Sequence, residues 1–252
     1  MKVKTQEIID FCAKNLQYGH ADVCPNGLQV EGKEYTQHVV TGVSASRELL
    51  QAAHAVGADS ILVHHGYFWH RERREITGWM HKRIEWLLKY RINLLAYHLP
   101  LDYHAQWGNN AQLAQQMNWE ITGRLRSSAG GELGMIGRLA TPMTSQDLAD
   151  ELAYKLKHTP VCISGHTRVI RTLAWCTGAA AADMHWAHQA GVDAYITGEI
   201  PENAVHIARE MPIVLYAAGH HATERFGVQA LGKALAEQFG IKHTYIEIPS
   251  PI

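Results

Sequence analysis

Several common signals are missing from this chain of 252 residues. No stretch approaches the roughly 18 consecutive apolar residues of a membrane span, and residues 1–7 are polar where a secretion signal would be apolar. No Cys-x-x-Cys pair occurs, which argues against a zinc ribbon or a redox pair. The four cysteines are scattered: Cys12, Cys24, Cys162 and Cys176. We therefore expect a cytoplasmic protein with reduced thiols and no membrane partner.

An excess of charge of one sign is also absent. Lys and Arg number 23 and Asp and Glu number 24, so the net charge is −1. The chain as a whole gives no electrostatic reason to bind nucleic acid. A short basic cluster, Arg71, Arg73 and Arg74, is expected to be a solvated loop. The chain lacks a Walker A motif, a G-x-G-x-x-G after a strand and a G-x-S-x-G elbow, which removes the usual support for nucleotide-cofactor enzymes and serine hydrolases.

Apolar periodicity predicts helices and strands that alternate along the chain. Helices are expected near residues 5–16, 46–56, 79–90, 110–117, 144–157, 181–190, 201–210 and 222–238. Strands are expected near residues 38–43, 60–63, 92–97, 161–163, 171–176, 193–196, 213–217 and 243–248. This alternation predicts an α/β fold with mostly parallel sheets covered by helices.

One pattern recurs and predicts two α/β lobes of similar topology. Thr41-Gly42 ends a strand before a helix and Gly57-Ala58-Asp59, and Thr177-Gly178 does the same before Gly191-Val192-Asp193. The alternative is that such turns simply recur in α/β proteins. Because residues 123–134 break the pattern, we expect one lobe to contain residues 1–125 and 219–252 and the other residues 126–218.

The chain contains seventeen histidines, and their placement favours a metal site. Ligands of open α/β sheets sit beyond the carboxyl ends of the strands. Polar residues follow the expected strands at His64-His65, His98, Glu199 and His220-His221. All of these fall where such a fold places its binding site.

The first of these segments is His64-His65, which follows the apolar run Ile61-Leu62-Val63. Where a strand ends and the chain turns, two adjacent imidazoles can diverge around a shared site and each hold a different ion. The alternative is a pair of loop histidines bonded to backbone carbonyls. Trp69, beside the pair, either packs in the core or stacks on a substrate ring.

Two more segments combine imidazole and carboxylate. In His98-Leu99-Pro100-Leu101-Asp102 the proline predicts an extended or turning segment, and Asp102 is either a ligand or a turn cap. If a helix begins at His220, then Glu224 lies one turn later on the same face, which makes a chelating pair. The alternative is a helix with an acidic first turn. Three such segments supply more donors than one metal needs, which favours two metals with a bridging carboxylate.

These segments, together with Pro25-Asn26-Gly27-Leu28-Gln29-Val30-Glu31-Gly32, resemble the YbgI-like family of GTP cyclohydrolase I type 2 homologues, also called NIF3-like proteins. The resemblance covers nearly the whole chain in order and spacing. It implies a dinuclear metal centre in the cleft between two lobes, with Glu224 bridging two divalent ions. The implied ligands are His64, His65, Asp102, His220 and Glu224.

The resemblance also implies ring-shaped hexamers built from dimers. Many relatives carry an Asp before the Asn-x-Gly-Leu segment, whereas this chain has Pro25 nearby, which leaves no acid assigned to that position. Nitrogen and oxygen ligands suit zinc, iron, manganese or nickel.

The function expected from these residues is metal-dependent hydrolysis of GTP, another purine-like ring or a phosphoester. We expect His98 to transfer protons and Glu199 to orient a ligand histidine. One alternative is a metal-binding assembly or regulatory protein without turnover. Another is a ring that encircles DNA, against which the near-neutral charge argues.

Overall fold

The computed structural model describes residues 1–164 and 169–252, which fold into two compact units. The first unit contains residues 1–107 and 227–248, and the second contains residues 108–226 and 249–252. The predicted lobes instead divided the chain after residues 125 and 218. The difference arises because strand β7 (Glu120–Leu125) pairs with β8 (Gly134–Thr144), and because Ala222 packs in the core of the second unit.

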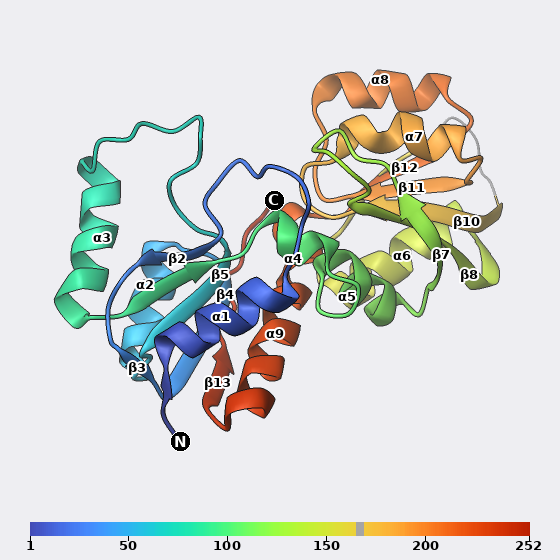
Figure 1. Cartoon of the computed structure of the whole chain (residues 1–252). Coiled ribbons are helices and arrows are strands. Elements are labelled where there is room, and N and C mark those ends of the chain that lie inside the picture. The colour runs from blue at the N-terminus through green and yellow to red at the C-terminus, as the bar shows by residue number, and fades with distance from the viewer. Residues whose placement is uncertain (165–168) are drawn as a thin grey trace. The chain divides into compact units, whose positions relative to one another are not determined.

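The first unit is built on a five-stranded sheet with the order β13-β4-β5-β6-β2 (Figure 1). Its strands are β2 (Gly27–Val30), β4 (His38–Ser44), β5 (Ser60–His65), β6 (Asn93–Ala96) and β13 (Lys242–Tyr245). The pairings β13–β4, β4–β5 and β5–β6 are parallel, and β2 joins β6 in the antiparallel sense. The prediction of a mostly parallel sheet therefore holds for this unit. A separate antiparallel pair joins β1 (Val3–Lys4) to β3 (Tyr35–Thr36).

Helices cover both faces of this sheet. Successive residues of a strand point to opposite faces, so Ile61 and Val63 of β5 enter one core cluster and Leu62 enters the other. The first cluster is closed by α2 (Arg47–Ala55) and α3 (Gly78–Tyr90), and the second by α1 (Thr5–Asn15) and the later part of α9 (His220–Phe239). Ser46 caps α2 by accepting a hydrogen bond from the backbone N–H of Leu49.

The second unit has a six-stranded sheet with the order β7-β8-β10-β11-β12-β9. Its remaining strands are β9 (Val161–Ile163), β10 (Val169–Cys176), β11 (Ala194–Thr197) and β12 (Val214–Ala217). The pairings β10–β11 and β11–β12 are parallel, whereas β7–β8, β8–β10 and β12–β9 are antiparallel. This sheet is therefore mixed, and the expectation of mostly parallel strands does not extend to it.

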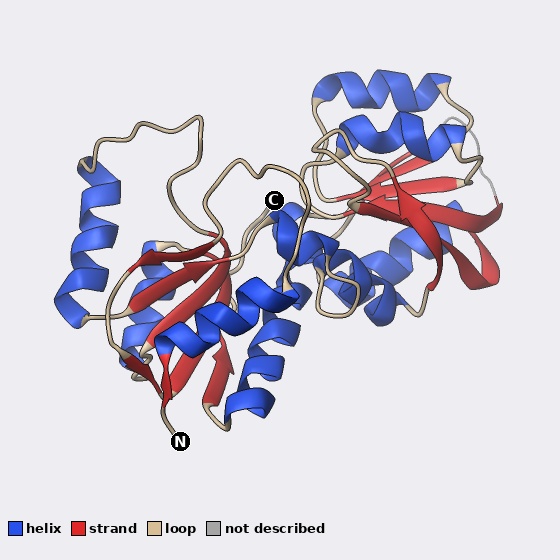
Figure 2. Ribbon diagram, viewed as in Figure 1, coloured by secondary structure: helices blue, strands red, loops and turns tan. Residues whose placement is uncertain are grey.

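Helices also cover both faces of the second sheet (Figure 2). On one face α5 (Asn109–Met117) and α6 (Ser145–Leu156) pack against a cluster that includes the buried Trp175 and Tyr216. On the other face lie α7 (Met184–Gln189) and α8 (Glu202–Glu210), with the short 3-10 helix Ala181–Asp183 leading into α7. Together the two units confirm the α/β class that the alternating pattern predicted.

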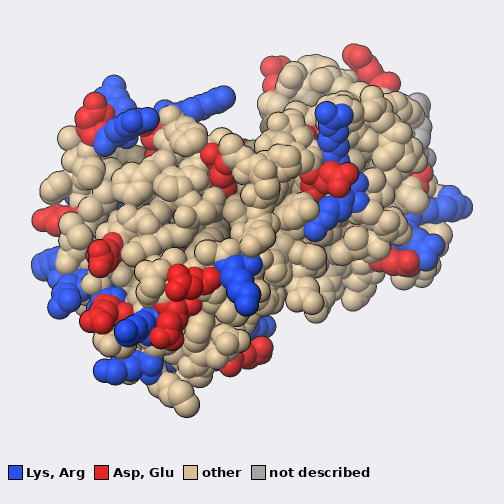
Figure 3. Space-filling view, in the orientation of Figure 1, with Lys and Arg blue, Asp and Glu red and all other residues tan. Residues whose placement is uncertain are grey.

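Charged side chains of both signs are interspersed over the face shown in Figure 3. This agrees with the near-neutral composition. Among the described residues, no helix combines the length and apolar character needed to cross a membrane.

Candidate metal centre

The carboxyl end of β5, the central strand of the first sheet, carries two adjacent imidazoles. His64 and His65 are the last two residues of this strand, and His64 is fully buried while His65 is partly exposed. Their rings lie with centroids 4.6 Å apart. The Nδ1 atom of His65 contacts Ser44 Oγ at 3.0 Å, which directs the opposite edge of the ring away from Ser44.

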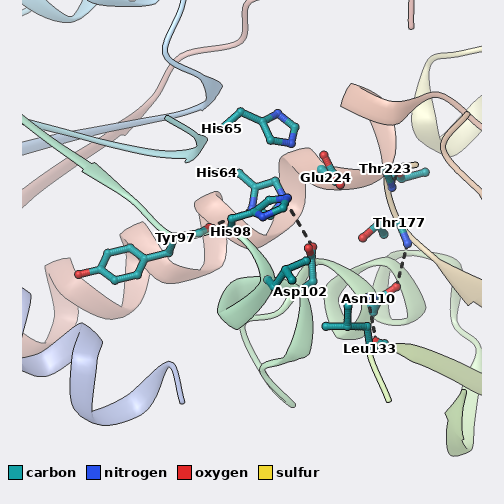
Figure 4. A network of polar contacts seen from close by, with 12 residues as sticks. His64, His65, Tyr97, His98, Asp102, Asn110, Leu133, Thr177, Thr223 and Glu224 are labelled. Carbon is teal, nitrogen blue, oxygen red and sulfur yellow. Dashed lines mark hydrogen bonds and ion pairs between the residues drawn. The ribbon is translucent and has the colours of Figure 1, made fainter. Parts of the chain in front are cut away.

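The hydrogen bond of His64 decides which of its nitrogens carries a proton. Nδ1 lies 2.9 Å from the carbonyl oxygen of Tyr97, and a carbonyl can only accept, so Nδ1 must donate. In the neutral ring the lone pair is then on Nε2, which lies 3.5 Å from Asp102 Oδ1 (Figure 4). Two ligands of one tetrahedral ion, each about 2.0–2.2 Å from it, lie about 3.3–3.6 Å apart. The pair therefore has the spacing and polarity of two ligands of one cation.

Asp102 is positioned by a short helix, α4 (Leu99–Tyr103), directly after β6. The sequence predicted an extended or turning segment here because of Pro100, and that prediction was wrong. Pro100 occupies the first turn of the helix, where no intrahelical hydrogen bond from its nitrogen is required. Only 6% of Asp102 is exposed, and a buried carboxylate must be compensated by hydrogen-bond donors, a cation or a proton.

The side chain of His98 is held by an acid that sequence reasoning missed. Asp22 Oδ1 lies 2.7 Å from His98 Nδ1, and Asp22 Oδ2 accepts hydrogen bonds from the Asn26 side chain and the Leu99 backbone N–H. Burial raises the pKa of Asp22, but the hydrogen bond and charge of His98 outweigh it and lower this pKa to about 2. Asp22 is therefore a carboxylate at neutral pH and orients the His98 ring.

The missed acid also corrects an interpretation made at Pro25. An acid does act just before Asn26-Gly27-Leu28, but it stands four positions before Asn26 in the sequence, at Asp22. The available signal was an Asp four residues before Asn26 in a loop rich in turn formers. Its partner lies 76 positions away, so no local pattern could identify the contact.

His64, His65 and His98 each offer a ring nitrogen, and these atoms lie within 4.8 Å of one another. A second group in the first unit combines Asp22, Cys24 and His98. Burial raises the pKa of the Cys24 thiol to about 12, and Asp22 Oδ1 already lies 2.7 Å from His98 Nδ1, so two of the three donors in this group are directed at each other rather than at an ion. The imidazole group therefore fits a cation better than the group that contains Cys24.

In the second unit, helix α9 begins at His220 and brings two donors onto one face, as predicted. His220 Nε2 lies 3.0 Å from Glu224 Oε2, and Glu224 is 3% exposed. On the other side of the ring, His220 Nδ1 lies 3.5 Å from Glu199 Oε1, whose side chain is 43% exposed. Glu199 therefore stands where it can orient His220, with the opposite nitrogen turned toward Glu224.

Gly178 shapes the space around the Glu224 carboxylate. Its φ is +70°, and a Cβ atom at this position would lie 2.1 Å from Glu224 Oε1. Two contacts hold the backbone at Gly178 in place. The Thr223 hydroxyl accepts from the Gly178 N–H and donates to the His220 carbonyl. The side-chain oxygen of Asn110 accepts from the N–H of the preceding residue, Thr177, at 3.0 Å (Figure 4). Only glycine leaves the carboxylate where it is.

The donor chemistry fits a divalent transition metal. Each unit contributes buried or half-buried imidazole and carboxylate groups with ligand-like spacing, and such nitrogen and oxygen sets suit zinc, iron, manganese or nickel. The His64 contact with the Tyr97 carbonyl is typical of ligand histidines, which usually donate their second ring N–H to an acceptor.

Comparison with known proteins gives consistent matches over nearly the whole chain. A Pseudomonas aeruginosa protein named GTP cyclohydrolase 1 type 2 homolog is 48% identical over 230 residues, which is 91% of each chain. The solved structure of protein ybgI, described as of unknown function, has a TM-score of 0.95 at 42% identity and covers 99% of this chain and 100% of its own. TTHA1606 from Thermus thermophilus has a TM-score of 0.87 at 28% identity, with 99% and 100% coverage.

A family model also matches residues 3–251. The match is to Duf34/NIF3 (NGG1p interacting factor 3) and spans both units. On this match and on the identity to its relatives, the chain belongs to the Duf34/NIF3 family.

Proposed function

We propose that this protein is a dinuclear metal-dependent hydrolase, a homologue of GTP cyclohydrolase 1 type 2, that acts on GTP, another purine-like compound or a phosphoester. The donors of both units would hold one pair of divalent ions, with Glu224 as the proposed bridging ligand. The proposed ligands are His64, His65, Asp102, His220 and Glu224.

The observation that carries this proposal is the arrangement of His64. Its Nδ1 donates to the Tyr97 carbonyl, and its Nε2 faces the buried Asp102 carboxylate at 3.5 Å. A lone pair and a carboxylate oxygen repel each other unless a proton or a metal cation lies between them. Burial makes that repulsion expensive, because few water molecules can screen it.

The course of helix α9 supports a shared role for the two donor sets. Its first turns carry His220 and Glu224 of the second unit, and its later turns carry Val228 and Leu231, which are buried in a core cluster of the first unit. One continuous helix therefore carries the His220 and Glu224 donors of the second unit and also packs in the core of the first unit, which holds the other donors.

His98 is proposed to move the proton. Asp22 accepts from Nδ1, so the proton-transfer function falls to Nε2 of the same ring. Two bound divalent ions would supply a water of lowered pKa and polarise the bond to be broken. Glu199, on the outer side of His220, keeps that ring oriented. The same geometry would let His98 act as a further ligand, and the metal content of a His98→Ala variant separates the two roles.

The first test is metal content together with turnover. Protein purified without chelator is expected to carry two divalent ions per chain, and His64→Ala is expected to lose at least one of them. His81→Ala, an exposed histidine on α3, is the matched control and keeps both. Elemental analysis by mass spectrometry measures the ions. Metal-free protein prepared without any chelating step would contradict the proposal.

The second test concerns the reaction. Metal-loaded protein is incubated with GTP, and formate release is measured beside a screen of phosphoesters and carboxylic esters. Hydrolysis that disappears in His98→Ala while the ions stay bound supports the assigned roles. Bound ions without turnover on any substrate would instead favour a metal-binding assembly or regulatory protein.

The proposal includes a homo-oligomer, a ring-shaped hexamer built from dimers, in the cytoplasm. Light scattering coupled to size-exclusion chromatography measures the assembly directly. A mass near six times 28.2 kDa is the expected result, and a monomer at micromolar concentration would contradict it. The interspersed surface charge gives duplex DNA no extended basic face on the side shown in Figure 3.

A further inference from the structure

We propose that a pocket beside His65 binds an oxyanion group, a carboxylate or phosphate, that the substrate carries on a planar ring. The pocket has a volume of about 190 Å³ and lies entirely within the first unit. A protein cavity of about 150 Å³ binds benzene, so this pocket has the size of a small substituted ring. Its principal lining residues are Ser44, Ser46, His65, Trp69, Trp79 and Arg83.

Arg83 supplies the positive charge. Its guanidinium carbon lies 4.7 Å from the centre of the Trp79 ring and 5.9 Å from that of Tyr67. Within residues 1–164 and 169–252, the structure gives this guanidinium no carboxylate partner. Stacking on an aromatic ring leaves the N–H groups of an arginine in the plane of the guanidinium, where they can meet both oxygens of a carboxylate or phosphate.

The tryptophans supply the flat walls. Trp79 is 55% exposed, an unusual placement for so large an apolar side chain, and it stands on α3 at the pocket. Trp69 connects the pocket to the donors, because its ring lies 5.9 Å from His65 and 4.9 Å from His98, centre to centre. A ring in the pocket would therefore lie beside the imidazoles to which the proposed function assigns the chemistry.

Neighbouring groups decide the sign of charge that the pocket accepts. Ser44 and Ser46 bring hydroxyl groups, and Ser46 caps the N-terminus of α2, the positive end of that helix. Glu72 also lines the pocket and brings a negative charge. Glu72 is exposed to solvent, so its charge is screened, whereas Arg83 is partly buried. The balance favours an anion.

This inference rests on the proposed function for its biological meaning, but its test needs no turnover. The probes are benzoate, benzamide and benzamidine, which share a shape and differ in charge, and phenylphosphonate, which distinguishes a phosphate-like from a carboxylate-like group. Binding is measured by NMR titration of the indole N–H signals, with Trp79→Phe assigning that residue. Chelator-treated and metal-loaded protein are compared, so that direct ligation of a probe to metal is recognised.

Benzoate or phenylphosphonate is expected to bind at least tenfold more tightly than benzamide in chelator-treated protein. Arg83→Gln is expected to reduce that preference to within twofold, and Lys82→Gln, an exposed cation on the same helix, is expected to preserve it. Glu72→Gln removes the opposing charge and is expected to strengthen anion binding two- to threefold. Melting temperatures confirm that each variant is folded.

Two results would overturn the inference. One is tighter binding of benzamidine than of either anion, which would make the pocket a cation site. The other is anion binding that Arg83→Gln leaves unchanged. Hydrolysis by a protein whose pocket does not discriminate the probes would refute this inference alone, and an Arg83-dependent pocket in a protein without metal would refute the proposed function alone.

Discussion

Replacing Gly178 with alanine tests whether the Glu224 carboxylate must stay where the second unit holds it. The new Cβ atom would lie 2.1 Å from Glu224 Oε1 and 3.2 Å from His220 Nε2, whereas ordinary contact begins at 3.4 Å. The carboxylate must therefore retreat by roughly 1.3 Å, far beyond the ~0.2 Å that a metal site tolerates in its ligand distances. We expect the affinity for metal to fall by about a hundredfold or more.

Gly191 provides a matched control for the backbone. Its φ is +71°, almost the same as the +70° of Gly178, and nothing lies within 4 Å of a Cβ atom added there. Alanine in the left-handed region costs roughly 1–2 kcal/mol at either position. Gly191→Ala should therefore lose that free energy of unfolding without losing metal, and the difference between the variants isolates the crowding of Glu224.

The assay combines urea unfolding of chelator-treated protein with metal affinity measured by competition against a chromophoric chelator. A double variant, Gly178→Ala with Glu224→Asp, shortens the side chain by one methylene and is expected to recover part of the affinity. Equal metal affinity in Gly178→Ala and Gly191→Ala, with both proteins folded, would show that Glu224 is not a ligand or that Gly178 does not position it.

Three further predictions concern groups outside the proposed ligand set. Burial and nearby positive charges lower the pKa of His243 from 6.5 to about 4, so the contribution of its neutral ring to the free energy of unfolding is complete above pH 6.5 and is lost as the pH falls toward 4. The free energy of unfolding measured in urea should fall by roughly 1–2 kcal/mol over that range, and a His243→Gln variant should lack this pH dependence. Asp22→Asn removes the charge that His98 Nδ1 contacts and should lower the free energy of unfolding by roughly 1–2 kcal/mol at pH 7. This loss should be present above pH 3.8 and disappear as the pH falls toward 2, and an unchanged unfolding midpoint at pH 7 would contradict it. Asn93 is fully buried and accepts the Gly32 N–H at 2.7 Å, so Asn93→Leu should cost roughly 2–3 kcal/mol in urea unfolding, and a loss below 0.5 kcal/mol would show that water replaces this bond.

Local patterns were sufficient for the elements that are buried along one stripe or on both faces. The strand Ser60–His65 and the helix Arg47–Ala55 lie close to their predicted positions. A continuous apolar run is stable when both faces of its strand are buried, and a capped amphipathic helix is stable when its apolar stripe faces the core. The helix His220–Phe239 was expected near residues 222–238 for the same reason. The helical step also predicted that His220 and Glu224 share a face.

Strands whose burial is partial or irregular escaped prediction. Gly27–Val30 was not among the expected strands, because the preceding proline and its own glycine weaken the signal of a strand of only four residues. Glu120–Leu125 is mostly exposed and shows no clear alternation, and its partner Gly134–Thr144 follows a stretch rich in glycine and serine. Such strands form because their backbone groups pair with a neighbour, and the partner of a strand is not recorded in its own periodicity.

The sequence by itself determined the α/β class, the order of the main elements and the presence of imidazoles and carboxylates after the strands, since these depend on near neighbours in the chain. Only the tertiary structure decided that Asp22 holds His98, that the Tyr97 carbonyl fixes the proton of His64, and that Trp69, Trp79 and Arg83 line one pocket. The physical reason is distance along the chain. A hydrogen bond or a pocket wall joins residues that folding brings together, and its strength depends on angles and burial that no spacing in the sequence encodes.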